Sequence, residues 1–173
     1  MRVDFDELQE YPDASRTFAR NRKAIAFLSS LGLMNSAYLY LFQTGRIKHL
    51  WCPGFGNSCE CIVSSPLAYQ GKIPDSLLGA IGYSVLLGFA LAGDEHRHGN
   101  QRILPILMGG CSFTALGLSA LLVYVQKKEF DDYCLWCLAS AAISSLTVPL
   151  ALPEFLEALR APKPVSASPS SFR

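Results

Sequence analysis

Four long apolar stretches alternate with shorter polar segments along the chain. They cover residues 24–42, 77–92, 103–125 and 133–152, and none of them contains Asp, Glu, Lys or Arg. A helix needs about 20 apolar residues, within a range of about 17–25, to cross the hydrocarbon core of a membrane. Three stretches have that length, and we expect the shorter second one to extend back through residues 74–76. The pattern predicts an all-α integral membrane protein built as a four-transmembrane-helix bundle.

These helices divide the chain into three predicted parts. They are a cytoplasmic N-terminal segment at residues 1–23, a membrane domain at residues 24–155 and a disordered cytoplasmic tail at residues 156–173. The tail is rich in Pro and Ser, and such a segment buries too little apolar surface to fold. Pro149 lies inside the last stretch and is expected to kink or end that helix, because proline removes a backbone donor.

The composition supports a membrane protein. Of the 173 residues, 50% are hydrophobic and 17% are charged, whereas an average soluble domain carries about 25% charged residues. A soluble protein with four buried helices would need a polar shell that so few charges do not supply. The formal net charge of +1 argues against a nucleic-acid-binding protein, which would carry a strongly basic patch.

Positive charges predict the orientation of the chain in the membrane. The N-terminal segment, the link between the second and third stretches, and the tail together hold ten of the 15 Lys and Arg residues. Because Lys and Arg accumulate on the cytoplasmic side of membrane proteins, we expect both termini in the cytoplasm and residues 46–76 and 126–132 on the other side.

Most of the cysteines lie on the predicted outer side, where disulfides form and persist. Three are in the first outer loop and two open the last helix: Cys52, Cys59, Cys61, Cys134 and Cys137. The sixth, Cys111, lies in the middle of the third stretch and is expected to be a small packing residue. The distribution predicts chemistry at the outer end of the bundle.

Cys134 and Cys137 form a Cys-x-x-Cys pair at the start of a helix. A disulfide that closes so small a loop adds little stability, so the pair is better suited to redox cycling than to a structural role. The helix dipole lowers the pKa of the first thiol. The nearby carboxylates of Glu129, Asp131 and Asp132 oppose that shift, and the sign of the net change stays open. A zinc site is disfavoured, because the loop cysteines lack the usual spacing of a zinc knuckle.

Taken together, these features resemble the vitamin K epoxide reductase family. The resemblance rests on Cys52 and Cys59 in the loop, on Ser65 six residues later, and on the Cys-x-x-Cys pair that opens the last helix. It covers roughly residues 20–155. It implies a four-helix membrane bundle around a quinone, with an outer cysteine-bearing loop. The resemblance favours the bacterial branch of the family, so we expect a bacterial inner membrane in which the outer side is the periplasm.

The resemblance also implies roles for single residues. Cys137 is expected to exchange electrons with a quinone, either ubiquinone or menaquinone. Cys134 is its partner and exchanges with Cys59, while Cys52 meets the protein substrate. Ser65 corresponds to a family serine near the redox centre.

Alternatives stay open at three positions. Cys61 could take the shuttle role, although Cys59 gives Ser65 the matching offset. Ser65 could simply cap a helix or turn. Trp136 is a candidate for the quinone site, and it is equally suited to anchor the helix at the membrane surface, where amphipathic aromatic residues are enriched.

The function implied by the resemblance is that of an enzyme, a quinone-dependent thiol-disulfide oxidoreductase that supports disulfide bond formation. Its partner would be a separate thioredoxin-like periplasmic protein, because the chain ends soon after the fourth stretch. Asp75 and Ala141 stand where animal members carry an asparagine and a tyrosine, which weakens an epoxide-reducing role. The alternatives are a vitamin K epoxide or quinone reductase and a non-enzymatic membrane subunit with structural disulfides. No metal and no nucleic acid are expected.

Overall fold

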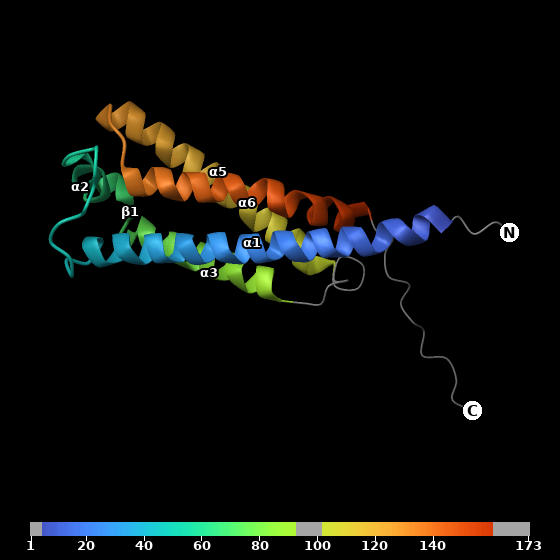
Figure 1. Ribbon diagram of the computed structural model, residues 1–173. Coiled ribbons are helices and arrows are strands. Elements are labelled where there is room, and N and C mark those ends of the chain that lie inside the picture. Colours follow the sequence, from blue (N-terminus) through green and yellow to red (C-terminus); the bar gives the residue numbers. More distant parts are fainter. Residues whose placement is uncertain (1–4, 93–101, 161–173) are drawn as a thin grey trace.

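The computed structural model describes residues 5–92 and 102–160, in which four long helices pack lengthwise against one another (Figure 1). They are α1 (Phe5–Gln43), α3 (Asp75–Leu91), α5 (Ile103–Phe130) and α6 (Leu135–Arg160). Successive long helices run in opposite directions (Figure 1). α1 and α5 each pack against both α3 and α6. The predicted all-α architecture is confirmed.

Three of the described helices are long and apolar enough to cross a membrane, namely residues Arg16–Gln43 of α1, the whole of α5 and the whole of α6. α3 is also apolar but has only 17 residues. Large apolar side chains on the outside of the bundle are exposed, among them Phe27, Met34, Leu91, Leu118 and Leu146. So much exposed apolar surface is typical of contact with lipid, and the chain is therefore a membrane protein.

Several helix limits differ from those expected. α1 is continuous from Phe5 and crosses the expected boundary at residue 23. α3 begins at Asp75, so the second stretch does extend back as expected. α6 does not end at Pro149 but continues through it to Arg160, and so includes residues that the sequence assigns to the tail. Packing against neighbouring helices lets a membrane helix tolerate an internal proline. The rest of the predicted tail, residues 161–173, lies outside the described residues.

The connection between α1 and α3 carries four short elements. They are α2 (Ser58–Val63), the 3-10 helix η1 (Pro66–Ala68), and the antiparallel strands β1 (Tyr69–Gln70) and β2 (Ile73–Pro74). α2 lies beside the start of α6, at the opposite end of the bundle from the start of α1 (Figure 1). We call this end, with α2 and the first turn of α6, the cysteine end.

Two clusters of buried side chains hold the bundle together. One lies at the cysteine end and consists of Leu39, Leu50, Cys59, Ile62, Val63 and Cys134. The other joins the four long helices and consists of Ile25, Leu86, Ala90, Met108 and Ala151. Because two of the cysteines belong to the first cluster, the packing of the loop onto the bundle is also what positions the candidate chemistry.

Candidate functional site

The connection between α1 and α3 holds a disulfide against the start of α6. Cys52 and Cys59 are bonded, with their Cα atoms 6.3 Å apart. Cys59 is fully buried, and its sulfur accepts a hydrogen bond from the Leu135 N–H group at 3.3 Å. Cys134, the residue before Leu135, is also fully buried and packs in the same cluster. The inner sulfur of the disulfide therefore lies at the segment that carries the second cysteine pair.

Cys134 and Cys137 carry free thiols that hydrogen bond to each other. The Cys137 thiol donates to the sulfur of Cys134 and lowers the pKa of Cys134, while burial works in the opposite direction. The N–H groups of Cys137 and Trp136, in the first turn of α6, lower this pKa further. The carboxylate that opposes the shift is Asp75 of α3, not the acidic residues beside the pair in the sequence. The Cys134 thiol is thus more acidic than an ordinary cysteine thiol.

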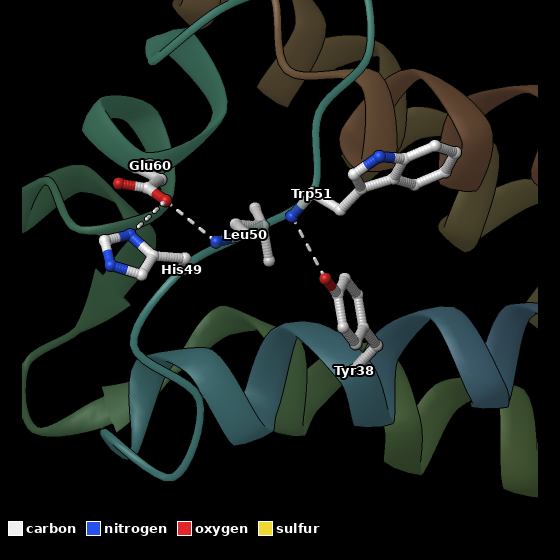
Figure 2. Close-up of polar contacts among 5 residues, drawn as sticks. All are labelled: Tyr38, His49, Leu50, Trp51 and Glu60. Atoms are coloured by element: carbon white, nitrogen blue, oxygen red, sulfur yellow. Dashed lines mark hydrogen bonds and ion pairs between the residues drawn. The ribbon is translucent and has the colours of Figure 1, made fainter.

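Hydrogen bonds from three helices hold the two residues that precede the loop disulfide. Glu60 of α2 accepts the Leu50 N–H at 2.8 Å, and the Tyr38 hydroxyl of α1 accepts the Trp51 N–H at 3.1 Å (Figure 2). On the other side, the indole N–H of Trp136 in α6 donates to the Trp51 carbonyl at 2.8 Å. The backbone next to Cys52 is therefore fixed to α1, α2 and α6 at once.

The segment between the two loop cysteines has backbone hydrogen bonds of its own, among them one from the Ser58 N–H to the Phe55 carbonyl at 3.1 Å. It turns at Gly54 and Gly56, whose φ angles of 83° and 52° favour glycine. At its end, the Ser58 hydroxyl donates to the Asp132 carboxylate, which ties α2 to the link between α5 and α6. That bond lowers the pKa of Asp132.

α2 separates the two cysteines that the sequence leaves as alternatives. Cys59 is buried and bonded to Cys52, whereas Cys61 is exposed and free. Residues two apart on a helix point in nearly opposite directions. The geometry therefore favours Cys59 as the cysteine that communicates with Cys134.

A cavity of about 250 Å³ lies between the four long helices, and Cys137 forms part of its wall. Its lining is mainly apolar, with polar groups from Asp75, Tyr83 and several serines. The Tyr83 hydroxyl donates to the Ser140 carbonyl at 3.1 Å and lies 3.3 Å from the Ser144 hydroxyl. The outer wall consists of leucines of α3 and α5 that are also exposed on the bundle surface: Leu78, Leu118, Leu121 and Leu122. The cavity is thus flanked by surface that would face lipid.

A smaller cavity, of about 30 Å³, lies on the other side of Cys137. Ser65, Asp75, Gln126 and Cys137 line it together with apolar side chains. Asp75 and Cys137 contribute to the walls of both cavities. Cys137 of the Cys-x-x-Cys pair therefore contributes to the walls of both the large cavity and the small one.

A disulfide, a dithiol and an apolar cavity thus follow one another along the cysteine end of the bundle. The family model described as "Vitamin K epoxide reductase family" matches residues 23–152, a range that contains all three. The chain belongs to the vitamin K epoxide reductase family. It is accordingly a membrane oxidoreductase that acts through cysteines. No curated protein sequence matches the chain at a significant level.

The other predicted site residues of this vitamin K epoxide reductase family member lie in different places. Ser65 is buried, donates to the Ile62 carbonyl at 2.7 Å and lines the small cavity beside Cys137. Ser65 thus closes a turn, which is one of its two expected roles, and it also lies near the redox pair. Trp136 lines neither cavity; its ring packs against Tyr38 at a centroid distance of 4.8 Å, and its N–H holds the loop.

Two glutamines at this site were not predicted. Gln126 of α5 accepts the Cys134 N–H at 3.0 Å. Gln43 ends α1, and its amide N–H donates to the Asp75 carboxylate at 2.9 Å. The amide oxygen of Gln43 accepts a hydrogen bond from the Ser76 hydroxyl. Each glutamine directly follows an apolar stretch, at 24–42 and 103–125. An uncharged polar residue at that position is a signal that could have identified both.

Proposed function

We propose that the protein is a thiol-disulfide oxidoreductase that oxidises a thioredoxin-like partner and passes the electrons through its two cysteine pairs to a quinone. One observation carries the proposal: the sulfur of Cys59 lies at the start of α6, next to Cys134, while Cys137 lines the apolar cavity. The two pairs and the cavity form a continuous route for electrons.

The first step takes place at the loop disulfide. Cys52 is half-buried whereas Cys59 is fully buried, so a partner reaches Cys52 first. A partner thiolate attacks the Cys52 sulfur, the S–S bond breaks, and Cys59 leaves as a thiolate. The second partner thiol then releases the partner as a disulfide, and the loop is left with two thiols.

In the second step, the Cys59 thiolate attacks Cys134 of the oxidised Cys134–Cys137 pair, and Cys137 leaves as a thiolate. Cys52 resolves the mixed disulfide, so the loop disulfide forms again and the inner pair becomes a dithiol. The structure has the loop pair bonded and the inner pair free, which corresponds to the state at the end of this step. The lowered pKa of Cys134 suits it as the leaving group when Cys52 resolves the intermediate.

The final acceptor fits the large cavity. Its volume of about 250 Å³ is slightly below the range of about 300–1,000 Å³ for small-molecule sites, which suits a quinone ring whose tail extends into lipid. The apolar walls suit the ring, and Asp75, Tyr83 and the serines offer polar groups for its oxygens. The inner dithiol loses two electrons and two protons and becomes a disulfide, and the quinone takes both up as a quinol.

We also propose that α3 is the fourth membrane span. Its 17 residues are about 26 Å long, which is close to the hydrocarbon thickness of about 30 Å. The excess of Lys and Arg on one side then supports both termini in the cytoplasm and the cysteine end on the opposite side of the membrane. Four spans return the chain to the side on which it began.

The test is quinone reduction by full-length protein in lipid nanodiscs, with a reduced thioredoxin-like protein as donor and a short-chain ubiquinone as acceptor. We expect turnover by the wild type and its loss in Cys137→Ala. The matched control is Cys111→Ala, a half-buried cysteine of α5 outside the proposed route, which should keep full activity. Undiminished turnover by Cys137→Ala would refute the mechanism. Reduction of vitamin K epoxide without oxidation of the protein donor would instead support the epoxide reductase alternative.

A further inference from the structure

Asp132 lies in the link between α5 and α6, and its carboxylate has two hydrogen-bond partners. One oxygen accepts the Ser58 hydroxyl of α2, and the other accepts the Tyr133 N–H at 2.8 Å. Ser58 directly precedes Cys59, and Tyr133 directly precedes Cys134. One carboxylate therefore binds the residue in front of each of the two cysteines that exchange with each other in the second step.

We propose that Asp132 is a positioning residue that aligns Cys59 with Cys134 for disulfide exchange. This inference rests on the proposed function, in which the Cys59 thiolate attacks Cys134. It assigns the alignment to an exposed side chain outside both cysteine pairs, with Ser58 as its partner on α2.

The two cysteines already lie together while the loop disulfide is intact. Both are fully buried in the same apolar cluster, and the Cys59 sulfur accepts the N–H of Leu135, the residue after Cys134, at 3.3 Å. When a partner opens the loop disulfide, Cys59 loses its covalent bond to Cys52. A contact that keeps α2 at the start of α6 then matters most, because exchange within a molecule is fast only while the reacting atoms stay close.

α2 does not hold this position by itself. It has only six residues, and its N-cap, Asn57, makes no side-chain hydrogen bond to it. Isolated helices this short are marginal in water, so the place of α2 depends on contacts with neighbouring elements. Gln43 of α1 donates to the Val63 carbonyl at the end of α2 at 3.2 Å, and Asp132 binds Ser58 at its start. Of these two contacts, the one at the start of α2 adjoins the reactive cysteine.

Asp132 acts through position and not through its charge on the inner pair. The Ser58 hydroxyl, followed by the Tyr133 N–H, lowers the pKa of Asp132, so its carboxylate is ionised at neutral pH. A hydrogen bond to an ionised acceptor is stronger than one between neutral groups. The carboxylate that opposes the lowered pKa of Cys134 is that of Asp75. Asp132 therefore holds α2 without making Cys134 less acidic.

The experiment measures how readily Cys59 and Cys134 bond to each other. Full-length protein that carries Cys52→Ala and Cys137→Ala is equilibrated in nanodiscs with mixtures of reduced and oxidised dithiothreitol. When the Cys59–Cys134 disulfide forms, the two thiols lose two electrons and two protons, which oxidised dithiothreitol takes up. Differential alkylation and peptide mass spectrometry give the bonded fraction, and from it the effective concentration of one thiol at the other.

We expect Ser58→Ala and Asp132→Ala, each added to this protein, to lower the effective concentration about fivefold, the factor that belongs to one lost hydrogen bond. The two changes together should lower it no further than Asp132→Ala alone, because both remove the same bond. Ser58→Thr, which keeps a hydroxyl, should leave it unchanged. Asp131→Asn is the matched control: it removes the neighbouring carboxylate, which binds Lys127, and Asn suits the φ angle of 50° at this residue. It should also leave the value unchanged.

An unchanged effective concentration in either Ser58→Ala or Asp132→Ala would overturn the inference, and so would an equal fall in Asp131→Asn. If Asp132→Ala fails to fold, the comparison of Ser58→Ala with Ser58→Thr decides, and equal values in those two would be the refuting result. The assay contains neither the partner nor a quinone. A failure of the proposed function would therefore appear separately, as absent quinone turnover in the wild type.

Discussion

Gly32 of α1 provides a sharp test of how the large cavity is built. It is buried against the ring of Tyr83 in α3, and a methyl group added at Gly32 would lie 2.5 Å from the Tyr83 Cε1 atom. Tyr83 is itself buried and bonded to the Ser140 carbonyl. In Gly32→Ala the ring must therefore shift, and it must do so within the wall of the cavity.

The expected destabilisation follows from three contributions. Overpacking costs about 1–3 kcal/mol, and loss of the Tyr83 hydroxyl bond adds about 1 kcal/mol. Replacing a helical glycine by alanine returns about 0.5–1 kcal/mol. The net loss of about 1–3.5 kcal/mol corresponds to a fall in Tm of about 2–14 °C for a chain of this size. The KM for quinone should also rise, because Tyr83 lines the cavity and its ring is displaced.

The assay is thermal unfolding in detergent together with quinone kinetics, and Gly88→Ala is the matched control. Gly88 lies in α3, and a methyl group there meets no atom within 4 Å, so this variant should be as stable as the wild type or slightly more so. Exchange between the partner and the loop disulfide should be unchanged in both variants. If Gly32→Ala matched Gly88→Ala in both Tm and KM, the described contact between α1 and α3 would be wrong.

Three further predictions concern the cysteine end. Cys59→Ala should stop electron transfer from the partner to the inner pair, whereas Cys61→Ala should not, as stopped-flow oxidation of the partner would show; the reverse result would move the shuttle to Cys61. Trp136→Phe keeps an aromatic side chain but loses the 2.8 Å hydrogen bond to the Trp51 carbonyl. Backbone hydrogen exchange in the loop should therefore rise about fivefold, and unchanged exchange would contradict the contact. Because its pKa is lowered by the Cys137 thiol, Cys134 should be alkylated with a midpoint below the usual pH of about 8.5. Cys137→Ala should move that midpoint upward, and a midpoint that stayed in place would exclude the Cys137 thiol as the cause.

The order of elements could be read from the sequence because each depends on a local property. The apolar stretches predict where α1, α5 and α6 lie, although α1 begins well before its stretch and α6 continues beyond its own. Proline gave the poorest guide to a helix end: α6 continues through Pro149 and Pro153, because neighbouring helices support the backbone in ways that a single stretch does not reveal. The short helix α2 was not predicted, since six residues with no apolar periodicity carry too little local signal.

The candidate site likewise contains residues that the sequence predicts and residues that only the packing of the helices brings together. The four cysteines and Ser65 were predicted by their types and spacing, which are properties of the linear chain. The sequence favours Cys59 over Cys61 only through its offset from Ser65, and the physical basis of that choice is which face of α2 packs against α6. Asp75 and Gln126 are separated from Cys137 along the chain, and only the packing of α3 and α5 against α6 brings them to its thiol. The sequence by itself thus determined that this protein is a helical membrane protein with two cysteine pairs. The tertiary structure alone decided which side chains surround each sulfur, because those contacts come from helices distant in the chain.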